Sequence, residues 1–237
     1  MPGLSELFDA YSLRARVYPG LLTVLPITVI MVVLWPQSPA QALWPVAVSV
    51  GGMFFLTNWV RDRGLKLEKR LVQQWDGLPT TRRLRWADGA TDPDFERRRT
   101  QLEKLVGIPL PSAADEDGER SDAIYLSAVR GLRIWVRQRA DAFPLVQQEN
   151  AAYGFRRNLL ALKPIGIALC VLGLIVDGVW AVAVDATASV GILGLVHGAL
   201  LVSWITVVCG EWVRDQGERY ADQLFDALLS PTGADAA

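Results

Sequence analysis

Polar and apolar residues are gathered into long blocks along this chain. Four apolar stretches, at roughly 17–36, 42–60, 164–184 and 190–210, contain almost no charged residues. Each is long enough to cross a hydrocarbon core of about 30 Å at a rise of about 1.5 Å per residue. Only the short segments 36–42 and 184–189 connect the first with the second stretch and the third with the fourth. The pattern predicts an all-α integral membrane protein with four transmembrane helices in two hairpins.

Composition agrees with a membrane protein. Hydrophobic residues make up 51% of the 237 positions, and the mean hydropathy is +0.23. A secretory signal peptide is the alternative for the first stretch, because Arg14 and Arg16 precede it. That stretch is too long for a typical signal sequence, and a second apolar stretch follows almost at once. A retained hairpin is therefore the better interpretation.

The distribution of basic residues predicts the orientation. Of the 24 Lys and Arg residues, two precede the first stretch, 20 lie in 61–163, and two follow the fourth. The positive-inside rule then places both termini and 61–163 in the cytoplasm, beneath the inner (plasma) membrane. The expected divisions are an N-terminal lead (1–16), hairpin 1 (17–60), a cytoplasmic insert (61–163), hairpin 2 (164–210) and a cytoplasmic tail (211–237).

The insert is predicted to be helical. Segment 61–75 continues the second span as a polar-faced helix, and 144–163 leads into the third span. Between them, Asp92, Pro93 and Gly107 delimit one helix, and another is expected over 121–141. Residues 79–86 are too short for a helix of their own and suggest a turn or an extended segment.

A hexapeptide recurs with one change: WVRDRG at 59–64 and WVRDQG at 212–217. Matching Tyr and Arg positions also precede the first and third spans. Both halves begin inside, so the favoured interpretation is duplication of a hairpin, giving two parallel repeats. The alternative is convergence, because any span exit favours Trp at the interface and Arg just inside it. The predicted interface anchors are Trp59, Arg61, Trp212 and Arg214.

Two ionisable residues fall inside the spans, Asp177 and His197. Each lies about ten residues from the centre of the connection near 187, which places them at similar depth in the third and fourth spans. An ionisable group at membrane depth suggests a functional site, such as a proton relay. The alternative, which we favour, is a structural interhelical hydrogen bond of about 1 kcal/mol. Hairpin 1 has no counterpart to this pair.

Small residues recur in the spans of hairpin 2. Gly166 and Gly173 are seven residues apart, and Gly191, Gly194 and Gly198 share one face of the fourth span. Glycines let helices approach closely in lipid, so packing within or between chains is expected.

Arginines cluster in the insert, which has 20 basic and 15 acidic residues. The candidate ligand or head-group contacts are Arg130, Arg133, Arg137, Arg82, Arg83 and Arg85. Three interpretations are open: binding of anionic lipid head groups, binding of a nucleotide-like ligand, and a solvated face that reflects topology alone. Nucleic acid is not expected, because acidic residues are interleaved and no aromatic stacking platform accompanies the arginines.

No residue pattern for catalysis, metal ligation or cofactor binding is present in the sequence. Cys170 and Cys209 lie in apolar stretches and are expected to be small buried hydrophobes. We therefore expect a non-enzymatic sensor, effector or channel-like assembly in the lipid bilayer, either a homo-oligomer or part of a membrane complex. A proton-coupled transporter using Asp177 and His197, and a scaffold subunit, are the alternatives.

Overall fold

The computed structural model describes residues 13–34, 39–183 and 188–230, apart from the side chains of 34, 39–42, 44–46, 50 and 53–57. Every regular element in these ranges is helical, which confirms the all-α prediction. The chain forms two compact units. Unit 1 comprises Met1–Lys69 and Gly154–Val213, and unit 2 comprises Arg70–Tyr153 and Arg214–Ala237.

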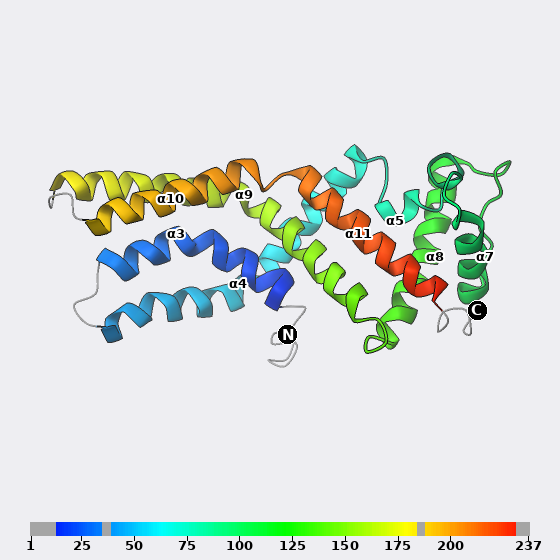
Figure 1. The fold of residues 1–237 in the computed structure, drawn as a ribbon, viewed down its shortest axis with the longest axis horizontal. Helices are drawn as coiled ribbons and strands as arrows, with labels where there is room; N and C mark the ends of the chain where they lie inside the picture. Colours follow the sequence, from blue (N-terminus) through cyan, green and yellow to red (C-terminus); the bar gives the residue numbers. More distant parts are fainter. Residues whose placement is uncertain (1–12, 35–38, 184–187, 231–237) are drawn as a thin grey trace. The chain divides into compact units, whose positions relative to one another are not determined.

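Unit 1 contains long apolar helices (Figure 1). A short π-helix, η1 (Leu13–Val17), leads into α3 (Tyr18–Leu34). The larger part of α4 (Pro39–Gln74), most of α9 (Pro144–Ala183) and all of α10 (Ala188–Thr206) complete the unit, with the first residues of α11 (Gly210–Leu229). The predicted helical continuity of 42–60 with the segment after residue 60, and of 144–163 with 164–183, is confirmed by the unbroken α4 and α9.

Three of these helices are long and apolar enough to cross a membrane: Leu13–Val33, Pro144–Ala183 and Ala188–Thr206. They correspond to the first, third and fourth predicted spans. The second predicted span, 42–60, falls in α4, where several side chains lie outside the described residues. The connections at 35–38 and 184–187 lie outside them as well. The fourth span and the duplicated hairpins stay predictions.

Polar side chains inside unit 1 form hydrogen bonds with backbone and side-chain partners. Thr28 Oγ1 and Ser49 Oγ are 2.8 Å apart and join α3 to α4. Lys163 Nζ donates to the carbonyl oxygens of Ile205 and Val208, at 3.1 and 2.7 Å. These carbonyls lie at the C-terminal end of α10, where backbone acceptors lack intrahelical partners. Lys163 on α9 thus supplies hydrogen-bond donors to the carbonyl oxygens at the C-terminal end of α10.

Unit 2 is built from shorter helices. After α4 ends, α5 (Pro79–Arg82) and α6 (Trp86–Gly89) form single turns, followed by α7 (Phe95–Val106) and α8 (Gly118–Gln138). The expected turn or extended segment at 79–86 is therefore mostly helical. The helix predicted with Asp92 as its N-cap begins two residues later, with Asp94 at the N-cap position. It ends where predicted, because Gly107 takes the left-handed conformation at φ 66°. The predicted 121–141 helix begins and ends about three residues earlier.

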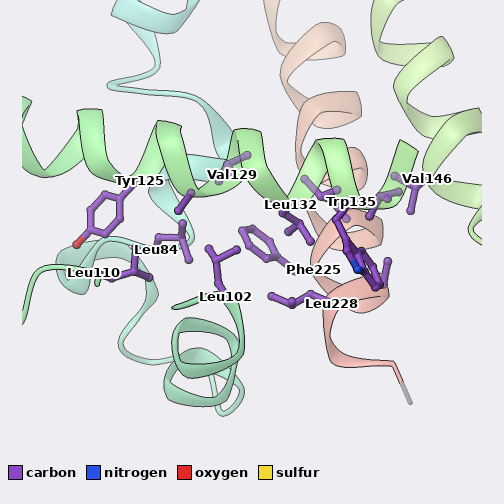
Figure 2. Packing of buried hydrophobic residues seen from close by; sticks show 14 residues of the cluster. Leu84, Leu102, Leu110, Tyr125, Val129, Leu132, Trp135, Val146, Phe225 and Leu228 are labelled. Atoms are coloured by element: carbon purple, nitrogen blue, oxygen red, sulfur yellow. The ribbon is translucent and has the colours of Figure 1, made fainter. Parts of the chain in front are cut away.

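A single hydrophobic core holds unit 2 together. Figure 2 shows Tyr125, Val129, Leu132 and Trp135 extending from one side of α8. Their spacing of three and four residues places them on one helical face. Leu102 of α7 and Phe225 of α11 pack in the same cluster. The segment that the sequence suggested as a tail therefore supplies a core helix, because Leu224, Phe225 and Leu228 are fully or almost fully buried.

The two hexapeptide copies share a burial pattern. Val60 and Val213 are buried, and the glycine four residues later is buried in both copies. A Cβ on Gly64 would lie 1.8 Å from Oδ1 of Asn158, within unit 1. A Cβ on Gly217 would lie 3.2 Å from Pro79 and 3.3 Å from the Tyr153 ring, within unit 2. Close packing therefore explains why valine and glycine recur in both copies, which interface chemistry alone does not.

Candidate functional site

The structure brings the two ionisable residues of the third and fourth apolar stretches into contact. Nδ1 of His197 on α10 lies 2.6 Å from Oδ2 of Asp177 on α9. The opposite ring nitrogen, Nε2, lies 3.1 Å from the backbone oxygen of Pro26 on α3. His197 is 0% exposed and Asp177 is 4% exposed. Three helices therefore meet at one imidazole ring, and we call these three residues the imidazole cluster.

The positions of these residues follow from the helices that carry them. Asp177 and His197 are each ten residues from the centre of the connection near 187. They therefore lie at equal distances along their helices, as predicted from the sequence. Gly173, one turn before Asp177, leaves space for the ring, since a Cβ there would lie 2.9 Å from Cδ2 of His197. The contact with Pro26 was not foreseen, because a backbone carbonyl has no signature in the sequence.

The glycines of hairpin 2 divide into two groups. Gly166 lies against Trp204 and Gly173 against His197, so both provide close approach between α9 and α10, as predicted. Around Gly191, Gly194 and Gly198, a Cβ would meet no atom of the described residues within 4 Å. These three glycines therefore do not serve packing within the described part of the chain, and contact with another chain stays a prediction.

Three of the predicted binding arginines are engaged in ion pairs within unit 2. Arg82 binds Asp88 at 3.2 Å, Arg83 binds Glu218 and Asp222, and Arg85 binds Asp76 at 3.0 Å and Asp122 at 2.5 Å. The hydrogen bonds that Arg85 donates to the Asp122 carboxylate are the main reason that the pKa of Arg85 is raised above its ordinary value. These arginines join the loop after α4 to α8 and α11, so part of their binding capacity is already used.

The other three predicted binding arginines lie apart from that group. Arg130, Arg133 and Arg137 are exposed on α8, on the side opposite to its buried residues. None forms an ion pair within the described residues. They do not line the cavity described below.

The two buried arginines of α7, Arg98 and Arg99, were not among the site residues predicted from the sequence. Arg99 donates to the carbonyl oxygens of Leu84 and Pro111 and to the hydroxyl of Tyr125, at 3.2 Å for the last. Its guanidinium also lies 4.9 Å from the Trp86 ring centre. Arg98 binds Asp92 at 2.6 Å. The signal was present in the spacing, because Phe95 and Leu102 define a face that includes positions 98 and 99.

A cavity of about 300 Å³ opens in unit 2 among these arginines. Four guanidinium groups line it, together with three carboxylates, a proline and a glycine: Arg82, Arg83, Arg98, Arg214, Asp88, Asp92, Glu218, Pro79 and Gly89. The hydrogen bond from Arg98 is the largest reason that the pKa of Asp92 lies below its ordinary value. Asp92 is therefore ionised at neutral pH.

Two lining arginines have unused donors. The Nε atom of Arg98 is buried and has no hydrogen-bond partner, and the whole residue is 6% exposed. Arg214 takes part in no hydrogen bond or ion pair among the described residues. The guanidinium group of Arg214 therefore has donors available to an acceptor in the cavity, whereas the Nε of Arg98 is enclosed by protein atoms.

The predicted interface anchors have different surroundings. Trp59 is 44% exposed, and the Arg63 guanidinium lies 4.7 Å from its ring centre. Trp212 is half-buried, with Arg156 at 4.7 Å from its ring centre. Arg61 is exposed, whereas Arg214 lines the cavity. The two predicted anchor pairs, Trp59 with Arg61 and Trp212 with Arg214, therefore occupy equivalent sequence positions but make different contacts.

Comparison of the chain with protein-family models, curated proteins and solved structures finds no match. The chain is defined by its architecture: an all-helical protein with three helices that are apolar and long enough to span a membrane, and a second helical unit with its own core.

Proposed function

We propose that this chain is a non-enzymatic membrane sensor or effector that receives a small anion in unit 2. In this proposal four spans form two hairpins in the inner membrane, and both termini and 61–163 face the cytoplasm, in keeping with the positive-inside rule. The observation that carries the proposal is the arginine-lined cavity, in which Arg214 forms no ion pair with a described residue.

Charge and donor number favour an anionic ligand. The four lining guanidinium groups exceed the three lining carboxylates by one, so the lining has a net charge of +1. Asp88, Asp92 and Glu218 each accept from one of the lining arginines. The unused N–H groups of Arg214 are donors only. An oxyanion supplies the acceptors and the negative charge that this lining lacks.

The cavity size limits the ligand class. A volume of about 300 Å³ is at the lower end of the range for small-molecule sites. This size favours a small phosphorylated or carboxylated metabolite over a complete nucleotide. Guanidinium groups bind phosphate and carboxylate through paired hydrogen bonds, so both classes fit the chemistry.

Replacing Arg214 with glutamine is expected to weaken phosphate binding by about tenfold or more, because a charge-assisted hydrogen bond contributes about 1.5–3 kcal/mol. The measurement is isothermal titration of the detergent-solubilised full chain with inorganic phosphate, and with acetate to distinguish the two anions. Arg130→Gln removes the same charge from an exposed position outside the cavity and is the matched control. Equal weakening by both variants, or no saturable binding of either anion, would contradict the proposal.

A second candidate function rests on the exposed face of α8. Arg130, Arg133 and Arg137 have no ion pairs in the described residues, and Leu126 and Ile134 are 45% and 48% exposed beside them. Basic and apolar side chains on one helical face favour an anionic lipid surface, at about 1 kcal/mol per basic residue.

Binding of this face to lipid is expected to slow amide exchange over 126–137 when the full chain is placed in nanodiscs that contain phosphatidylglycerol. Changing Arg130, Arg133 and Arg137 to glutamine should remove the difference from nanodiscs of phosphatidylcholine alone. Identical exchange of the wild type in both lipids would exclude this function and leave the cavity proposal intact.

A further inference from the structure

The imidazole cluster has a fixed arrangement of protons. A peptide carbonyl oxygen only accepts hydrogen bonds, so the 3.1 Å contact with Pro26 requires a proton on Nε2 of His197. The 2.6 Å contact between Nδ1 and Oδ2 of Asp177 then requires one proton between those atoms, since two lone pairs would repel each other. The proton belongs either to Asp177 or to a fully protonated ring. In both cases the pair has no net charge.

The surroundings favour this neutral arrangement. Segments 18–34, 164–183 and 188–206 contain no charged side chain other than Asp177, and His197 is the only other readily ionised group near neutral pH. A net charge at this position would therefore have no counter-ion within these three apolar segments. Burial of an uncompensated charge in an apolar environment is costly, whereas a neutral hydrogen-bonded pair is not.

The same contacts argue against proton relay. A relay through imidazole accepts a proton at one nitrogen and passes another from the opposite nitrogen to a base. The group that faces Nε2 is the carbonyl oxygen of Pro26, which is not a base in the physiological range. The ring is also 0% exposed, so no solvent reaches the second nitrogen.

We infer that the imidazole cluster is a closed one-proton bridge: His197 fastens α3 to the α9–α10 pair, keeps a single proton between Nδ1 and Oδ2, and passes none on. This role differs from anion binding in unit 2 and is independent of it. A closed bridge provides no route for protons through these residues, which a proton-coupled transporter would need.

The chain itself offers a direct test, because His197 is its only histidine. Nitrogen-15 histidine labelling of the full chain in lipid bilayers yields signals from this ring alone in solid-state NMR. We expect Nε2 to carry a proton and to donate it to the Pro26 carbonyl oxygen, and Nδ1 to share its proton with Asp177. An Nε2 without a proton, or an Nδ1 with no hydrogen bond to the carboxyl group, would overturn the inference.

Two variants test the bridge independently of the spectrum. Asp177→Asn keeps a donor for Nδ1 and should leave the thermal midpoint within about 2 °C of the wild type. Asp177→Leu has similar size and no donor, and should lower the midpoint by about 4 °C or more, at about 2–4 °C per lost kcal/mol for a chain of this length. Equal midpoints for the two variants, or a large loss in Asp177→Asn alone, would contradict the bridge.

Discussion

Replacing Gly166 with alanine should destabilise the protein, although the same change at Gly191 should be neutral or stabilising. A Cβ on Gly166 would lie 2.3 Å from the Trp204 ring, which is rigid and 4% exposed. Overpacking of this kind costs about 1–3 kcal/mol. At Gly191 no atom of the described residues lies within 4 Å of the added Cβ, and alanine is favoured over glycine within a helix by up to about 1 kcal/mol.

The thermal midpoint of the detergent-solubilised full chain is the measurement for both glycine variants. A fall of several degrees is expected for Gly166→Ala, at about 2–4 °C per kcal/mol for a chain of this length. The midpoint of Gly191→Ala should stay level or rise. Opposite signs are the important result. A fall in both variants would contradict the expected difference and would show that Gly191 packs closely against another chain.

The second large effect is expected at Arg99. Replacement by methionine removes the donor for two backbone oxygens and for the Tyr125 hydroxyl, all buried or part-buried in unit 2. At about 1 kcal/mol for each acceptor, the loss is about 3 kcal/mol. Contacts of the guanidinium with the rings of Trp86, Phe95 and Tyr125 are also lost. Methionine retains much of the apolar volume, so the effect reports mainly on the polar contacts.

Amide exchange across α7 and α8 is the appropriate measurement, because it reports on the core of unit 2 directly. Faster exchange in both helices is expected for Arg99→Met. Arg97→Met is the matched control on the same helix, since Arg97 is largely exposed and its ion pair with Asp94 is 3.9 Å long. Exchange as slow in Arg99→Met as in Arg97→Met would show that the buried guanidinium is dispensable.

Helical periodicity predicted most of the regular structure, and local chemistry explains the errors. The α7 helix ends at Gly107 as expected, because a glycine in the left-handed conformation terminates a helix well. The α8 helix starts at Gly118, before the predicted Ser121, since its first turn needs no strong apolar residue. At α5, Pro79 begins a helical turn with its fixed φ where a turn or extended segment was expected.

The candidate sites were predicted in part. Asp177 and His197 were predictable from the sequence, because ionisable residues are rare in apolar spans. Pro26 was not, because its contribution is a backbone oxygen. The cavity was missed for a different reason: Arg98 belongs to a run of three arginines that resembles a solvated face, and its burial depends on Phe225, more than a hundred residues away.

The repeated hexapeptide has a consequence for how this chain tolerates change. Gly64 and Gly217 occupy matching positions in the repeat but have unrelated neighbours, Asn158 in one copy and Pro79 with Tyr153 in the other. Selection therefore acts on the two glycines separately. A change in Asn158 can relax the requirement at Gly64 while Gly217 stays fixed, so resemblance between the copies will be lost unevenly as homologous chains diverge.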